Sequence, residues 1–223
     1  MVATTDQKAR LLDLTTGVLE LVRDGNRDIG SVSSVLQIIK DDPCFETRLL
    51  PREESETEEP KLLLEFLGTV SIPATTERCV AKEKFREDTS KNARVKIYTT
   101  GSNFDKWFLG KVEEPISETE LRYHRLRRPS VDEPILAELG GQEKAETTLT
   151  ELYTLLEQQP RGEEGILLTN GCANIFYVKD VSGSLRSVCA GWGSRSGGWG
   201  LSAYLVGSPH GWCDGSRIFS RNS

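Results

Sequence analysis

The sequence has little of the chemistry that most catalytic sites need. Its 223 residues include two histidines, His124 and His210, and none of the motifs G-x-x-x-x-G-K-[ST], G-x-S-x-G or H-E-x-x-H. A loose G-x-G-x-x-A match at Gly198, Gly200 and Ala203 is followed by a predicted strand, where a dinucleotide site needs a helix. We therefore expect no cofactor and no bound metal.

The chain also lacks long apolar runs and a cysteine framework. No run approaches the ~18–20 apolar residues of a membrane span, and the opening MVATTDQKAR has no apolar signal-peptide core. The five cysteines are an odd number without compact spacing, which argues against disulfides and for a reducing compartment. We expect a cytoplasmic protein with no membrane partner.

Two kinds of cysteine chemistry are open to the tail of the chain. His210 and Cys213 have an H-x-x-C spacing, and Cys172 and Cys189 could complete a zinc site, but zinc sites usually show two close ligand pairs and only one is close here. Inert cysteines in a sheet fit the pattern better. A thiolate–imidazolium pair of Cys213 and His210 is a second possibility, which would make the protein a small cysteine hydrolase.

Charge is distributed unevenly over the sequence. The net charge is −6, yet residues 165–223 hold five basic side chains against two acidic ones, a surplus of three, so residues 1–164 carry −9. Residues 1–164 and residues 165–223 therefore present electrostatic potentials of opposite sign to solvent or to partners.

Composition and periodicity divide the chain into four predicted segments. Apolar residues recur at helical spacing on both sides of Gly25, which predicts a helical hairpin over 1–43. An acidic linker, 44–60, follows and contains PREESETEEP. We expect an α+β body over 61–164 and a Trp-rich antiparallel sheet over 165–223.

The predicted fold class is thus α+β, with an N-terminal helical hairpin, a mixed α+β body and a C-terminal antiparallel β-meander of three to four strands. In the body, we expect strands in LLLEFLGTVSI, ARVKIYTT and ELRYHRLR, a short helix in FDKWFLG, and later helices over 130–139 and around Leu149, Leu152 and Leu156.

In the tail, Asn170-Gly171 predicts a hairpin between ILLT and CANIFYVK, unless ILLT is a loop packed on the preceding helix. GSRSGG separates strands in SLRSVCAGW and WGLSAYLV, and RIFS closes the meander.

Aromatic and basic residues of the tail form the first candidate binding surface. Two tryptophans flank a glycine-rich turn and a third follows in a loop that can fold back over the sheet. The predicted surface comprises Arg186, Trp192, Arg195, Trp199, Trp212 and Arg217. The structural alternative is that these rings form the core of a sheet of about 55 residues.

A second candidate surface is the basic stretch LRYHRLRRPS. As a strand, it places Arg122 and His124 on one face and Tyr123, Arg125 and Arg127 on the other, with Arg128 following. Such an edge could contact phosphates, with Tyr123 stacking on a base. It could equally be an edge strand that its charges protect from aggregation.

Several segments together carry a family resemblance over nearly the whole chain. These are VLELVRDGNRD, LGTVSIPATTERCVAKEKF, NFDKWFLGKVEEP and the ending GILLTNGCANIFYVKD through RIFSRNS. The chain resembles uncharacterised proteins of candidate-phylum bacteria with reduced genomes. The resemblance implies modular reuse of similar ends with varied middles, and it implies no activity or site residue.

The function predicted from these patterns is that of a non-enzymatic interaction protein. We expect a protein partner at the helical hairpin or the C-terminal sheet. Nucleic-acid binding through the basic stretch and the C-terminal sheet is the alternative, and the cysteine hydrolase is the second alternative.

Overall fold

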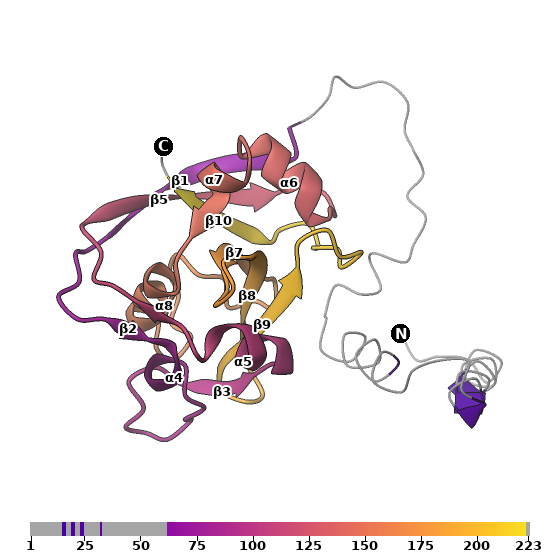
Figure 1. The fold of residues 1–223 in the computed structure, drawn as a ribbon, viewed down its shortest axis with the longest axis horizontal. Coiled ribbons are helices and arrows are strands. Elements are labelled where there is room, and N and C mark those ends of the chain that lie inside the picture. Colours follow the sequence, from indigo (N-terminus) through magenta and orange to yellow (C-terminus); the bar gives the residue numbers. More distant parts are fainter. Residues whose placement is uncertain (1–14, 17–18, 21–22, 25–31, 33–61, 222–223) are drawn as a thin grey trace. The chain divides into compact units, whose positions relative to one another are not determined.

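A computed structural model of the chain describes residues 15–16, 19–20, 23–24, 32 and 62–221. The chain divides into two compact units, Met1–Phe45 and Glu46–Ser223. All strands of the described residues belong to the second unit (Figure 1). The predicted acidic linker and most of the predicted helical hairpin lie outside the described residues.

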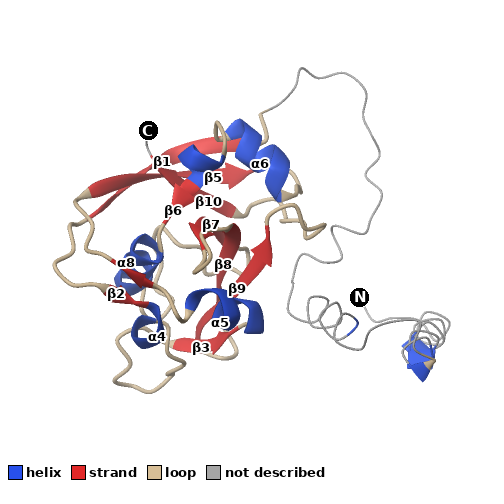
Figure 2. Cartoon of the chain, in the orientation of Figure 1, coloured by secondary structure: helices blue, strands red, loops and turns tan. Residues whose placement is uncertain are grey.

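Eight strands of the described part form one mixed sheet (Figure 2). In spatial order, seven of them are β1 (Leu64–Ile72), β5 (Thr119–Leu126), β10 (Arg217–Arg221), β7 (Asn174–Lys179), β8 (Leu185–Gly193), β9 (Gly198–Leu205) and β3 (Ile97–Thr100). The eighth, β6 (Glu146–Thr147), pairs with β7 beyond the point where β10 does. A separate two-stranded sheet pairs β2 (Cys79–Val80) with β4 (Val112–Glu113).

This topology shows that the predicted fold class is wrong. The described unit has no separate C-terminal meander, because the closing RIFS strand, β10, pairs antiparallel with β5 of the body and parallel with β7 of the tail. Body and tail therefore share one mixed sheet with short helices on its faces. The predicted hairpin at Asn170-Gly171 is also absent from the described fold. ILLT is instead a loop, whose Leu167 amide donates to Gln159 Oε1 at 2.7 Å.

Strict side-chain alternation divides the interior into two cores, one on each face of the sheet. Helices α4 (Ala81–Lys84), α5 (Ser102–Phe108) and α8 (Leu149–Gln158) cover one face, here called the α8 face. Helices α6 (Asp132–Glu138) and α7 (Gln142–Ala145) cover the other, the α6 face. In β7, Phe176 and Val178 belong to the first core, and Ile175 and Tyr177 to the second.

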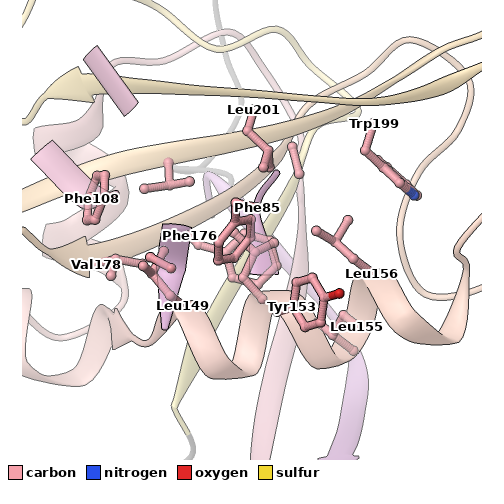
Figure 3. Close-up of a cluster of buried hydrophobic side chains, with 14 of the residues drawn as sticks. Phe85, Phe108, Leu149, Tyr153, Leu155, Leu156, Phe176, Val178, Trp199 and Leu201 are labelled. Carbon is pink, nitrogen blue, oxygen red and sulfur yellow. The ribbon is translucent and has the colours of Figure 1, made fainter. Parts of the chain in front are cut away.

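Helix α8 is the principal cover of its face. Thr148 and Glu151 form a capping box that satisfies the first amide groups of the helix. Figure 3 shows Leu149, Tyr153 and Leu156 pointing from α8 toward the strands, where they meet a cluster of aromatic and aliphatic side chains. The helix predicted around Leu149, Leu152 and Leu156 is confirmed.

The α6 face is organised around a buried carboxylate. Asp132, the first residue of α6, is 1% exposed. It accepts hydrogen bonds from Tyr177 Oη at 2.9 Å, Trp212 Nε1 at 2.7 Å and Ser187 Oγ at 3.0 Å. Burial raises the pKa of Asp132, although the three donors oppose the shift. The carboxylate thereby joins α6 to β7, β8 and the loop before β10.

Replacing Asp132 tests how much the fold depends on this carboxylate. Asp132→Ala leaves three buried donors unsatisfied at roughly 1–3 kcal/mol each, so urea denaturation should show a loss of about 3 kcal/mol or more. Asp132→Asn keeps an acceptor for Trp212 and should stay within about 1 kcal/mol of the wild type. Exposed Glu133→Ala is the matched control. A loss below about 1 kcal/mol for Asp132→Ala contradicts the structural role.

The raised pKa of Asp132 also predicts a dependence on pH. Because the pKa is higher in the folded than in the unfolded chain, protonation favours folding. The stability that this proton contributes is present at low pH and is lost as pH rises above about 4, the ordinary range for an unfolded aspartate, and through the folded pKa. Asp132→Asn has no such group. The free energy of unfolding of the wild type should therefore fall relative to that of Asp132→Asn as pH rises; a constant difference contradicts the shift.

Candidate functional site

A pocket of about 210 Å³ opens between α8 and the segment that joins β1 to β2. Residues 74–79 line one side. Four side chains of α8, at positions i, i+3, i+4 and i+7 and so on one flank of the helix, line the other: Thr150, Tyr153, Thr154 and Glu157. Lys84 at the end of α4 and Arg94 complete the lining. The capped N-terminal turn of α8 thus fixes one wall of the pocket.

Cys79 and Thr150 are the most deeply buried polar residues of this lining, at 4% and 5% exposure. Burial raises the pKa of the Cys79 thiol, and this effect outweighs the hydrogen bond from Thr150 and the nearby charge of Lys84. The thiol is therefore protonated at neutral pH, a state in which cysteine is a poor nucleophile and a weak metal ligand.

Glu113 anchors the N-terminal turn of α8, which forms one wall of the pocket. Its carboxylate accepts from the backbone amides of Leu149 and Thr150 at 3.1 and 2.8 Å and from Thr150 Oγ1 at 2.7 Å. Lys111 Nζ lies 3.0 Å from the same carboxylate. Burial raises the pKa of Glu113, but Lys111 and the Thr150 donors outweigh burial and the net pKa is lowered. The negative charge stays at the N-terminus of α8, where the helix dipole favours it.

The rim of the pocket is rich in cations. Lys84 Nζ lies 5.2 Å from the centroid of the Tyr153 ring, and no described carboxylate lies within ion-pair distance of it. Arg94 pairs with Glu157, and Arg78 pairs with Glu114 at 2.9 Å in an exposed position. Lys84 is thus the cation of the rim that is left without an anionic partner among the described residues.

The buried hydroxyl of Tyr153 is a further titratable group of the pocket. Burial raises its pKa to about 12, and the neighbouring Glu157 adds to the shift. Tyr153 and Cys79 both remain protonated near neutrality. The lining also carries charges of both signs, because Glu77, Arg78 and the Arg94–Glu157 pair contribute to it beside Lys84. This polar arrangement can bind a ligand.

The structure places the tryptophans of the first candidate surface in the core. Trp199 is fully buried on the α8 face and donates from Nε1 to the Gln159 carbonyl at 2.9 Å. Trp212 is 3% exposed on the opposite face, bonded to Asp132. Trp192 is half-buried, 5.4 Å from Trp199 in an edge-to-face contact. The three rings therefore do not share one exposed surface: Trp192 and Trp199 are paired on the α8 face, and Trp212 packs from a loop into the core of the α6 face. The alternative, in which the rings form the core, describes Trp199 and Trp212.

Glycine makes the packing of Trp192 possible. A Cβ atom built at Gly162, whose φ is +73°, would lie 2.2 Å from the indole of Trp192. The ring therefore packs directly on the backbone after α8, which explains why it is only partly accessible.

The arginines of that surface are dispersed. Arg186 donates from Nε to Asp180 Oδ2 at 2.7 Å. Its guanidinium also lies 4.4 Å from the centroid of the Trp107 ring, so both the charge and the flat face of this side chain already have partners. Arg195 is exposed in the turn between β8 and β9. Arg217, in β10, lies instead beside the basic stretch. The six residues do not form one surface.

The basic stretch forms β5, with the predicted division of its side chains between two faces. Arg122 lies 4.7 Å from the Phe66 ring on the α6 face, and Tyr123 and Arg125 lie on the α8 face. The strand is not an edge, however, because β1 and β10 flank it. Arg127 and Arg128 follow the strand and are exposed.

The tail cysteines and His210 have packing roles in the described structure. The His210 ring stacks on Tyr204 with centroids 3.9 Å apart. Cys213 is buried and its Sγ lies 3.3 Å from Ser216 Oγ. Burial and the nearby Cys213 raise the pKa of the Cys189 thiol to about 12. Within residues 62–221 and the few described before them, no group of three or more His, Cys, Asp or Glu side chains is placed to hold a metal ion.

The pocket was not among the sites predicted from the sequence. Its one usable signal is the polar line Thr150, Tyr153, Thr154 and Glu157 on the flank of a helix that is otherwise apolar. Such a line is typical of a solvent-exposed helix face, which is why it does not by itself indicate a pocket.

Burial of Cys79 predicts slow alkylation. In the native protein, iodoacetamide at pH 7.5 should modify Cys79 at least ten times more slowly than in the urea-unfolded chain, because the thiol is both inaccessible and protonated. Peptide mass spectrometry over time measures the rate at each cysteine. Equal rates in the folded and unfolded chain would show that folding neither shields the Cys79 thiol nor raises its pKa.

Comparison with known proteins gives no match for this chain: no family model, no curated protein and no solved structure is similar to it. None of the helices in the described ranges is both long and apolar enough to traverse a bilayer.

Proposed function

We propose that the unit built on the mixed sheet is a non-enzymatic binding module, which takes a small ligand carrying a carboxylate or phosphate group into the pocket beside α8. The observation that carries this proposal is Lys84, which lies over Tyr153 at the rim without an anionic partner among the described residues. An acidic group on a ligand would supply that partner.

The size of the pocket limits the ligand. A volume of about 210 Å³ lies below the ~300–1,000 Å³ typical of sites for drug-sized molecules. The ligand is therefore a small acid or a single phosphorylated group of a larger molecule.

The side chains that line the pocket are suited to bind polar groups of a ligand and are not suited to catalysis. The Tyr153 hydroxyl and the rim cations are suited to donate hydrogen bonds to oxygen atoms of the ligand, whereas the Thr150 hydroxyl already donates to Glu113. Cys79 and Tyr153 stay protonated, so neither is prepared to attack or to accept a proton. In this proposal, the protein acts as an interaction protein through the pocket and not through the predicted tryptophan surface. We also propose that it is located in the cytoplasm.

Replacing Lys84 tests the charge requirement. Lys84→Met keeps the length and apolar stem of the side chain and removes the charge. If a charge-assisted hydrogen bond worth about 1.5–3 kcal/mol is lost, the affinity for the acid falls about 10- to 100-fold. Titration of ¹⁵N-labelled protein with inorganic phosphate and with succinate measures the affinity through the amides of Thr150, Tyr153 and Thr154.

Exposed Lys144 on α7 is the matched control, because Lys144→Met removes the same charge from the opposite face of the sheet. Its affinity should equal that of the wild type. Perturbations that map away from α8, or equal affinity of the Lys84 and wild-type proteins, would exclude the pocket as the anion site.

A further inference from the structure

The register of the sheet places two arginines side by side. Arg125 of β5 and Arg217 of β10 are directly paired across the antiparallel ladder, so their side chains leave the same face. Like charges at opposite positions destabilise a sheet. The sequence thus contains an unfavourable pair in the middle of its main sheet, at the junction on which the fold depends.

Glu65 of β1 is directly paired with Arg125 on its other side, so one carboxylate faces the pair, although it lies within ion-pair distance only of Arg127. Arg217 donates to the carbonyl of Ile166, and neither Arg125 nor Arg217 has an acidic side chain of the described residues within ion-pair distance. The nearest such pairing joins Arg127 to Glu65 at 3.7 Å, with both side chains partly exposed. Arg217 is half-buried, and this desolvation lowers the pKa of its guanidinium. A partly desolvated cation without a counter-ion is costly unless a ligand supplies the charge.

Tyr123 holds the guanidinium of Arg217 in place. The ring lies two residues before Arg125 on the same face, and its centroid is 5.3 Å from the Arg217 guanidinium carbon. Space for the ring comes from Gly68 on β1, where a Cβ atom would lie 3.0 Å from the Tyr123 hydroxyl and where the β1–β5 register shifts. The arginine is therefore positioned by the fold and is not a free surface side chain.

We propose that Arg125 and Arg217 form a phosphate clamp for single-stranded nucleic acid. Two guanidiniums that leave adjacent strands can grip one phosphate with several parallel N–H donors. Exposed Arg127 and Arg128 continue the positive charge past the end of β5, over more than one phosphate, which favours a polymeric anion over an isolated one. Arg125 is itself exposed, so an extended strand can reach this end of β5 and contact the three exposed arginines in succession.

The test is the affinity of the full chain for fluorescein-labelled (dT)20, measured by anisotropy at 50 and 200 mM salt. Arg125→Gln/Arg217→Gln should weaken binding at 50 mM salt at least 10-fold and should lower the slope of log K against log salt by about one or more. Arg86→Gln removes one exposed charge from another part of the chain and should change affinity less than 2-fold. A wild type that does not bind, or an Arg86 variant as weak as the double variant, overturns the proposal.

Competition identifies the source of the phosphate. Unlabelled (dT)20 should displace the probe at micromolar strand concentrations, whereas inorganic phosphate at the same phosphate concentration should not. Equal competition by inorganic phosphate would overturn the assignment to nucleic acid and would leave a site for single phosphates.

A measurement without nucleic acid checks the premise and the folding of the variants. If the repulsion between Arg125 and Arg217 exceeds the attraction between Arg125 and Glu65, Arg125→Gln should raise the melting temperature at low salt, with a smaller rise at high salt. A lower melting temperature for that variant would show that Glu65 compensates the charge of Arg125 and would overturn the inference. The clamp shares no residue with the α8 pocket, so each of the two proposals can fail alone.

Discussion

The pairing of β10 between β5 and β7 is the constraint on which the rest of the structure depends. Without this five-residue strand, the main sheet would separate into β1–β5 on one side and β7–β8–β9–β3 with β6 on the other. β10 thus joins β1 and β5 of the body to the tail strands β7, β8 and β9, with which β3 and β6 of the body are also paired. It also contributes Ile218 to one core and Phe219 to the other, and Phe219 stacks on Phe176 with ring centroids 4.4 Å apart.

Helix α8, and with it the pocket, is tied to the same strand. Arg221 of β10 lies 3.2 Å from the fully buried carboxylate of Glu151, which also belongs to the capping box of α8. Glu113 fixes the first amides of the helix from the other side. These contacts orient the polar flank of α8 toward Cys79 and Lys84. Glu151 is fully buried, so removing Arg221 would leave its carboxylate with fewer compensating contacts and should weaken the anchoring of α8.

Local periodicity predicted the elements whose neighbours are close in sequence. The helix around Leu152 and the two strands on either side of GSRSGG are confirmed, because each depends on side-chain spacing within one or two elements. The position of RIFS and the burial of Trp199 could not be predicted in this way. Alternation shows which residues share a face of a strand, but it does not show which strand lies beside it or what covers that face. The pocket escaped prediction for the same reason, since Thr150 meets Cys79 only through the tertiary arrangement of α8 and β2.

Hydrogen exchange in the native protein tests the central place of β10 most directly. If the strand is an interior member of one continuous sheet, the amides of Ile218, Phe219 and Ser220 exchange in the slowest group, together with those of β5 and β7 and with similar opening free energies. Rapid exchange over β10, with β7 and β8 still protected, would mean that the final strand is not integrated and that the two halves fold separately.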